Sequence, residues 1–199
     1  MKDMKILIDA GHGIDTPGKR SPDGTFREYL WNRQVADKVV AMLQAKGADA
    51  VLVVPELTDI PLKIRAARVN GVCDKLGASN ALLVSIHSNA AGNGTAWMNA
   101  RGWSCYTSAG QTESDNVAEC LYDAFERAFP DRRIRKDMTD GDRDWEANFY
   151  ILKNTRCPAV LLENFFYDNE EECRWLLQEE TRQRIAEAIA EGVIQYVGK

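Results

Sequence analysis

The stretch ILIDAGHG at residues 6–13 decides the fold, because an apolar run leads directly into a turn of two glycines around a histidine. Two later stretches have the same form, ALLVSIHSN at residues 81–89 and AVLLE at residues 159–163. Strands that are buried on both faces of a parallel sheet have such continuous apolar sequences. The three stretches therefore predict three strands of a parallel sheet, each followed by an ionisable side chain.

The ionisable residues at these strand ends are His12, His87 and Glu163, and they include both histidines of the chain. In open α/β sheets the ligand site lies beyond the carboxyl ends of the strands. Zinc accepts histidine nitrogens and carboxylate oxygens, and its catalytic sites typically use three protein ligands and leave a position for water. The pattern therefore predicts a metal site, although a hydrogen-bonded surface or core residue remains the alternative for either histidine alone. Gly11 and Gly13 favour the metal site, because small residues allow a ligand to approach closely.

Two glutamates compete for the roles of metal ligand and catalytic base. Glu28 lies near the start of an expected helix, where a carboxylate also interacts favourably with the helix N-terminus without binding metal. Glu163 ends the last strand, where the alternative is an ion pair with Arg65 or Arg156. The residues alone leave this choice open.

The rest of the chain alternates between strand and helix patterns. Strands are expected at 5–10, 50–54, 81–87, 102–107 and 159–164, a short strand or turn at 149–152, and a polar loop at 130–147. Helices are expected from about 26–29 to 46, from a cap at 58–59 to about 76, over 114–129 and over 170–197. This alternation predicts an α/β fold of one domain over residues 1–199, with a mostly parallel twisted sheet of about five to six strands and helices on both faces.

Composition excludes several classes of protein. A net charge of −5 lacks the basic footprint of a nucleic-acid binder. The basic run at 132–136 is followed by aspartates and is expected to be a solvated loop face, with a grip on an anionic substrate as the alternative. Five cysteines without CxxC spacing predict reduced, mostly buried thiols. No apolar stretch approaches the roughly 18–20 residues that span a bilayer, so no membrane span is expected.

Further motifs follow the three strand ends in a fixed order along nearly the whole chain. They are Glu28 and Asn32, then Asp59, Leu62, Arg65 and Asn70, Gly102-Trp103, Ile151-Leu152, Pro158, and finally Phe166 and Asn169. Taken together with the strand ends, this set resembles the zinc-dependent N-acetylmuramoyl-L-alanine amidases, the family of bacterial cell-wall amidases and phage endolysins.

The resemblance assigns roles that the residues alone leave open. It implies one Zn²⁺ per chain, held by His12, Glu28 and His87, with Glu163 as the catalytic carboxylate. The family often has glycine where this chain has Phe165. Cell-division members of the family carry an inserted autoinhibitory helix after the fourth strand. Residues 106–110 instead lead directly into the next helix, so no autoinhibitory insert is evident and an open site is expected.

The reaction implied by the resemblance is hydrolysis of the amide bond between N-acetylmuramic acid and L-alanine of the peptidoglycan stem peptide. Metal-activated water would attack, and Glu163 would act as general base and then general acid. The alternatives are a zinc peptidase that cleaves within muropeptides and a non-catalytic peptidoglycan-binding module. Because no signal peptide is visible, we expect synthesis in the cytoplasm and action on the cell wall or periplasmic peptidoglycan after release or by a separate export route.

Overall fold

The three apolar stretches lie side by side at the centre of a six-stranded sheet of order β2-β1-β3-β6-β4-β5. The computed structural model describes residues 4–198, and its strands are β1 (Lys5–Ala10), β2 (Asp49–Leu52), β3 (Ala81–Asn89), β4 (Ser104–Thr107), β5 (Trp145–Glu146) and β6 (Ala159–Phe166). Strands β2, β1, β3 and β6 are parallel, whereas β4 is antiparallel to β6. The predicted α/β fold with a mostly parallel sheet is therefore confirmed.

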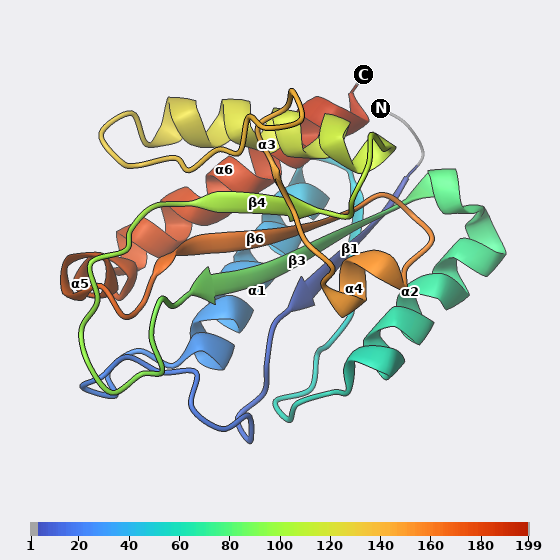
Figure 1. Ribbon diagram of the computed structural model, residues 1–199. Helices are drawn as coiled ribbons and strands as arrows, with labels where there is room; N and C mark the ends of the chain where they lie inside the picture. Colours follow the sequence, from blue (N-terminus) through green and yellow to red (C-terminus); the bar gives the residue numbers. More distant parts are fainter. Residues whose placement is uncertain (1–3, 199) are drawn as a thin grey trace.

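Helices cover both faces of this twisted sheet, as predicted (Figure 1). They are α1 (Glu28–Ala45), α2 (Leu62–Leu76), α3 (Glu113–Ala128), α4 (Tyr150–Lys153), α5 (Glu170–Leu176) and α6 (Glu179–Val197). Helices α1, α3, α5 and α6 pack on one face around the larger hydrophobic cluster. Helices α2 and α4 cover the other face with a smaller cluster.

The central strands have continuous apolar sequences because both of their faces are covered. In β1, Ile8 belongs to the larger cluster and its neighbour Leu7 to the smaller one. In β3, Val84 and Leu83 divide in the same way. Successive strand side chains point to opposite faces, so a strand between two helix layers needs apolar residues at every position.

Four local predictions were wrong. The polar loop expected over 130–147 contains the two-residue strand β5, which pairs with β4. Residues 149–152 were expected as a strand or turn, but α4 is a helical turn that buries the adjacent Ile151 and Leu152, which strand alternation would place on opposite faces. The single helix expected over 170–197 is two helices, since Gln178 has an extended backbone between α5 and α6. Helix α2 begins after Pro61 without a side-chain cap from residues 58–59.

Other composition-based predictions can also be compared with the structure. All five cysteines are free and buried, as expected. In the basic run, Arg132 binds Glu171 and stacks on Trp175, while Lys136 binds Glu126, so these cations contact the protein's own side chains. Among residues 4–198, no helix combines the length and apolar character needed to cross a membrane.

Two glycines inside helices differ in the space available for a side chain, so substitution by alanine should have opposite effects on stability. A Cβ on Gly192 of α6 would lie 2.9 Å from the Leu121 Cα of α3, whereas a Cβ on Gly71 of α2 meets no atom within 4 Å. We expect Gly192→Ala to destabilise the fold by about 1–3 kcal/mol through overpacking. Gly71→Ala should stabilise it by about 0.5–1 kcal/mol through helix propensity.

Urea unfolding of both variants measures these changes. Equal effects of the two substitutions would show that the close approach of α3 and α6 does not require glycine at position 192.

Candidate metal centre

Three chain segments converge at the carboxyl edge of the sheet. His12 follows β1, Glu28 is the first residue of α1, and His87 lies near the end of β3. One nitrogen or oxygen atom from each lies within 4.8 Å of the others. The structure thus brings together the three residues that the family resemblance implied as ligands, and their binding of metal stays a prediction.

Glu28 lies between the two imidazoles. Its Oε1 is 3.1 Å from His87 Nδ1 and its Oε2 is 3.4 Å from His12 Nε2. The backbone N–H of Ser88 also donates to Oε1, at 3.3 Å. The rings of His12 and His87 meet edge to face with their centroids 4.9 Å apart. Glu28 Oε2 is buried and accepts no hydrogen bond within the described part of the chain, so one oxygen remains available for a ligand.

The charges of this group are coupled. Burial opposes ionisation of Glu28, but the neighbouring imidazoles of His12 and His87 outweigh it and hold the pKa of the carboxyl below its usual range. Burial also opposes protonation of His87, yet its hydrogen bond with Glu28 raises the imidazole pKa. A buried carboxylate that is ionised between two imidazoles is a suitable donor set for a cation.

Glu163 lies beside this group on β6, at the position paired with His87 of β3. Burial raises the pKa of its carboxyl to about 7. Its Oε2 is buried and has no hydrogen-bond partner among residues 4–198. The arginines considered as its partners bind elsewhere, Arg65 to Asp9 and Arg156 to Asp74. Glu163 is therefore a buried carboxyl that can exchange a proton near neutral pH.

Two hollows flank the group and share His87. A polar hollow of about 320 Å³ is lined by Glu28, His87 and Glu163, by residues 17–19, 88–90 and 92–94, and by Tyr167. A second hollow, of about 390 Å³ and lined mainly by apolar atoms, lies between His12, His87 and residues 59–62, with Arg65 at its wall. A substrate can therefore approach the group from either side.

Comparison with known proteins identifies the family to which this chain is similar. The sequence profile of the N-acetylmuramoyl-L-alanine amidase family matches residues 6–195. This chain belongs to that family. The amidase is 31% identical to N-acetylmuramoyl-L-alanine amidase AmiA of Escherichia coli (strain K12), over 96% of this chain and 75% of AmiA. It is 28% identical to the endolysin of Bacillus phage SPP1, over 96% of this chain and 65% of the endolysin.

The fold has solved counterparts in the same family. The crystal structure of N-acetylmuramoyl-L-alanine amidase from Clostridium difficile 630 has a TM-score of 0.84 and 28% identity, covering 100% of this chain and 99% of that one. The catalytic domain of CwlV, an amidase from Bacillus (Paenibacillus) polymyxa var. colistinus, has a TM-score of 0.77 and 28% identity, covering 98% of both chains.

Two arginines hold His12 of the amidase, and sequence reasoning connected neither of them with this residue. His12 has a positive φ of 64°, which is uncommon outside glycine. Its carbonyl oxygen accepts hydrogen bonds from Arg33 Nη1 at 2.9 Å and Arg65 Nη2 at 3.3 Å. Arg65 also donates to Asp9 and Asp59. The sequence shows only that each of the helices that follow β1 and β2 carries an arginine. It does not show where these side chains point.

An asparagine of the adjacent strand holds the backbone of the second histidine. Asp9, Ser85 and Asn89 lie closer to the histidines in sequence. Within residues 4–198, however, Ser85 donates to Asp9 and Asn89 accepts from the following backbone N–H. Instead Asn164, next to Glu163, donates to the carbonyl oxygen of His87 at 2.8 Å.

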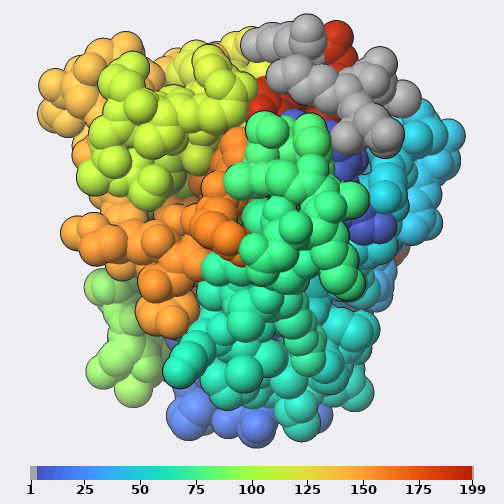
Figure 2. All heavy atoms as spheres, turned by 90° about the vertical axis from the view of Figure 1, so that its right-hand side faces the viewer, coloured from blue at the N-terminus to red at the C-terminus, as the bar shows by residue number. Residues whose placement is uncertain are grey.

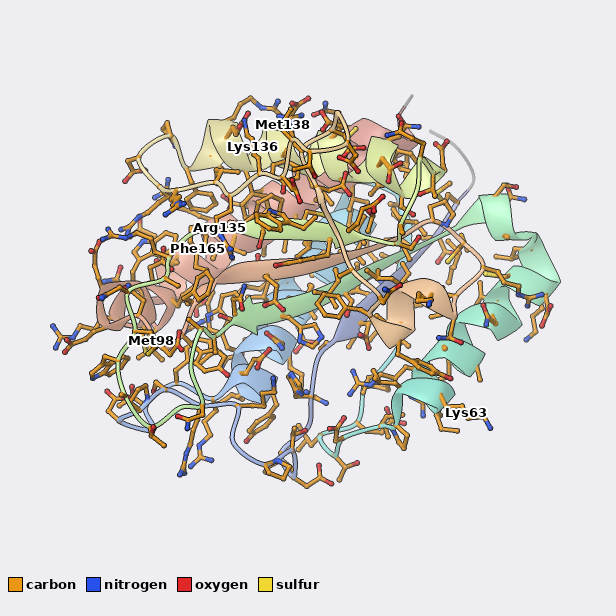
Figure 3. All side chains as sticks on the ribbon, in the orientation of Figure 1. Lys63, Met98, Arg135, Lys136, Met138 and Phe165 are labelled. Atoms are coloured by element: carbon orange, nitrogen blue, oxygen red, sulfur yellow. The ribbon has the colours of Figure 1, made fainter. Side chains whose placement is uncertain are left out.

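The backbone two residues after Glu163 has a conformation that favours glycine. Phe165 has a φ of 63°, a region that glycine adopts freely and other residues rarely enter. Its ring packs edge to face against Phe129 and Trp175, which offsets the backbone cost. The ring lies near the end of β6, on the side of α5 (Figure 3). The departure from glycine thus leaves the local turn intact.

Gly11 allows the second imidazole to lie against the chain after β1. A Cβ at this position would lie 2.1 Å from His87 Cε1. We expect Gly11→Ala to displace the ring and weaken zinc binding at least tenfold while the protein still folds. Competition with a coloured zinc chelator measures the affinity, with Gly71→Ala as the matched control. Wild-type affinity in Gly11→Ala would contradict the close approach.

Glu172 fixes the turn after β6, because its carboxylate accepts from the backbone N–H groups of Gly102 and Phe166. Burial raises its pKa from 4.5 to about 7. The folded state therefore binds this proton more tightly than the unfolded state, so the contribution of Glu172 to stability is fully present below about pH 4.5 and is lost as the pH rises through about 7.

The free energy of unfolding should fall less between about pH 4.5 and 7 in Glu172→Gln than in the wild type, by about 1–3 kcal/mol. Urea unfolding at several pH values between about 4.5 and 7 measures the slope. The same slope in Glu172→Gln and in the wild type would contradict the raised pKa of Glu172.

Proposed function

We propose that this chain is a zinc-dependent N-acetylmuramoyl-L-alanine amidase that cleaves the bond between N-acetylmuramic acid and the L-alanine of the stem peptide. His12, Glu28 and His87 would hold the zinc, and Glu163 would move the proton. The observation that carries the proposal is the buried carboxylate of Glu28 between two imidazoles, with Glu163 on the adjacent strand. Membership of the amidase family supports the choice of bond.

The donor set fits zinc. Two imidazoles and one carboxylate form one of the ligand sets of catalytic zinc sites, which leave a position for water. Glu28 Oε2 is buried without a hydrogen-bond partner in the described residues, as expected for an atom whose partner is a cation. When bound, zinc would polarise the scissile carbonyl and lower the pKa of a water molecule.

Glu163 has the properties of a general base that later acts as a general acid. Its carboxyl pKa is raised to about 7 by burial, which places proton exchange near neutral pH. Its Oε2 is free to accept the proton of the attacking water and then deliver that proton to the leaving amine nitrogen. This transfer leaves Glu163 in its starting state after each turnover.

The two hollows supply room for substrate on both sides of the scissile bond. The hollow beside residues 88–94 presents more polar atoms, and the hollow beside residues 59–62 presents more apolar atoms. A glycan is rich in hydroxyl groups, whereas a stem peptide carries aliphatic side chains. We assign the glycan strand to the polar hollow and the stem peptide to the apolar one.

Glu163→Gln tests the proton-transfer role separately from metal binding. The neutral amide cannot accept the proton, so we expect zinc to stay bound while the rate falls about 10²–10⁴-fold. Glu191→Gln is the matched control, since Glu191 is an exposed residue on α6. Wild-type activity in Glu163→Gln would refute the mechanism.

Mass spectrometry of fragments released from peptidoglycan identifies the bond. The zinc-loaded wild type should release intact stem peptides that begin with L-alanine, and a chelator should stop this release until zinc is restored. Cleavage within the peptide would instead show a zinc peptidase. Zinc binding by a folded protein that releases no fragments would favour a peptidoglycan-binding module.

A further inference from the structure

A second group of possible metal ligands lies on the opposite edge of the sheet from His12, Glu28 and His87. Asp115 is in the first turn of α3, and Asp142 and Asp144 lie in the segment that leads into β5. One carboxylate oxygen of each lies within 4.8 Å of the others. Because β4 runs antiparallel to β6, its end at Thr107 lies away from Glu163. This aspartate group (Asp115, Asp142 and Asp144) is thus separate from the proposed zinc site.

Two oxygens of the group are buried without partners. Asp144 is only 1% exposed, and its Oδ1 accepts no hydrogen bond from residues 4–198. The Oδ1 atom of Asp142 is also buried and accepts no hydrogen bond from these residues. The other oxygen of each residue is satisfied, since Thr107 Oγ1 donates to Asp144 Oδ2 and Gln111 Nε2 donates to Asp142 Oδ2. Buried polar atoms without partners are rare, and an ion is one of the few explanations.

No side-chain cation neutralises the group. Across the described part of the chain, none of the three aspartates forms an ion pair. Arg143 lies between two of them in sequence, but its guanidinium binds Glu119, Asp123 and Glu126 on α3. The N-terminus of α3 contributes only about half a positive charge. Three carboxylates therefore share one site with no counter-charge of comparable size.

We propose that Asp115, Asp142 and Asp144 form a calcium site that ties the segment before β5 to the start of α3. All the ligand atoms are oxygens, which suit hard cations such as Ca²⁺ and Mg²⁺ rather than zinc. Calcium accepts six to eight oxygen ligands in irregular geometry, whereas Mg²⁺ demands a near-ideal octahedron. Carboxylates drawn from a helix and a loop suit calcium, with water completing the shell.

The protonation of the group agrees with this assignment. Burial, together with the charges of Asp142 and Asp115, raises the pKa of the Asp144 carboxyl to about 7. Without a cation, the repulsion among the three carboxylates is relieved by a bound proton. A divalent cation relieves the same repulsion.

The site would add a direct link between this segment and the start of α3, beside the ion pairs that Arg143 already makes with α3. Strand β5 has only the residues Trp145–Glu146. Lys136 and Met138, on the approach to the aspartates, lie over α3 (Figure 3), and Figure 2 shows the same segment against the start of α3. A cation shared by Asp115 and Asp144 would join these two parts directly.

Thermal unfolding of the zinc-loaded protein in calcium-free buffer, with and without added CaCl₂, tests the proposal. Loading with zinc keeps calcium from acting at the histidines. At about a hundredfold excess over Kd, calcium should raise the wild-type Tm by roughly 5–10 °C. Terbium luminescence sensitised by the adjacent Trp145 reports binding directly, and calcium should displace the terbium.

Asp144→Asn is the decisive variant, and Asp140→Asn is its matched control, because Asp140 is an exposed residue of the same loop outside the aspartate group. Asp144→Asn should bind calcium at least tenfold more weakly. It should also be as stable as the wild type without calcium, because it relieves repulsion. Asp140→Asn should respond to calcium like the wild type.

Three outcomes would overturn the calcium site. They are a wild-type Tm that does not respond to calcium, an equal response in Asp144→Asn and the wild type, and an equal response to magnesium. Loss of stability in Asp144→Asn at every calcium concentration would likewise assign Asp144 a purely structural role. None of these measurements depends on amidase activity, so the result stands apart from the proposed function.

Discussion

The buried carboxylate of Glu28 is the constraint on which this architecture depends. An ionised carboxylate taken out of water costs several kcal/mol unless it is paired and hydrogen-bonded. Here the pairing needs His12 from the end of β1, His87 from the end of β3, and the N-terminus of α1, where the helix dipole favours a negative charge. Three elements distant in sequence must therefore meet at one point, and the parallel sheet order brings them there.

Two residues beside these side chains have backbone conformations that are unfavourable on their own. His12 and Phe165, which follow β1 and precede the end of β6, both have positive φ values. The first is held by hydrogen bonds from Arg33 and Arg65, and the second by aromatic packing against Trp175. Strained residues persist where the surrounding structure over-determines them, and such residues cluster at functional sites.

Some residues of this site can be placed from the sequence because they end a recognisable strand, and others cannot because they lie in loops or at helix starts. His12, His87 and Glu163 follow apolar runs that predict parallel strands. The carboxyl ends of parallel strands share one edge of the sheet, so these three residues are predicted to lie together. Glu28 comes from the start of a helix after a long loop, and only the family resemblance placed it with the histidines. The aspartate group was missed because it combines a helix start with a polar loop, and no periodicity relates two such segments. The break at Gln178 and the helix at 150–153 depend on tertiary packing in the same way.

The direction of β4 relates the two candidate ion sites. The segment after α3 runs along this strand, with Arg135 bonded to the backbone of Trp103 near one edge and Ala147 bonded to Thr107 at the other. Arg135 is close enough to Glu163 to lower the pKa of that carboxyl against the larger effect of burial. A cation bound by Asp144 would fix the far end of the segment whose near end carries Arg135.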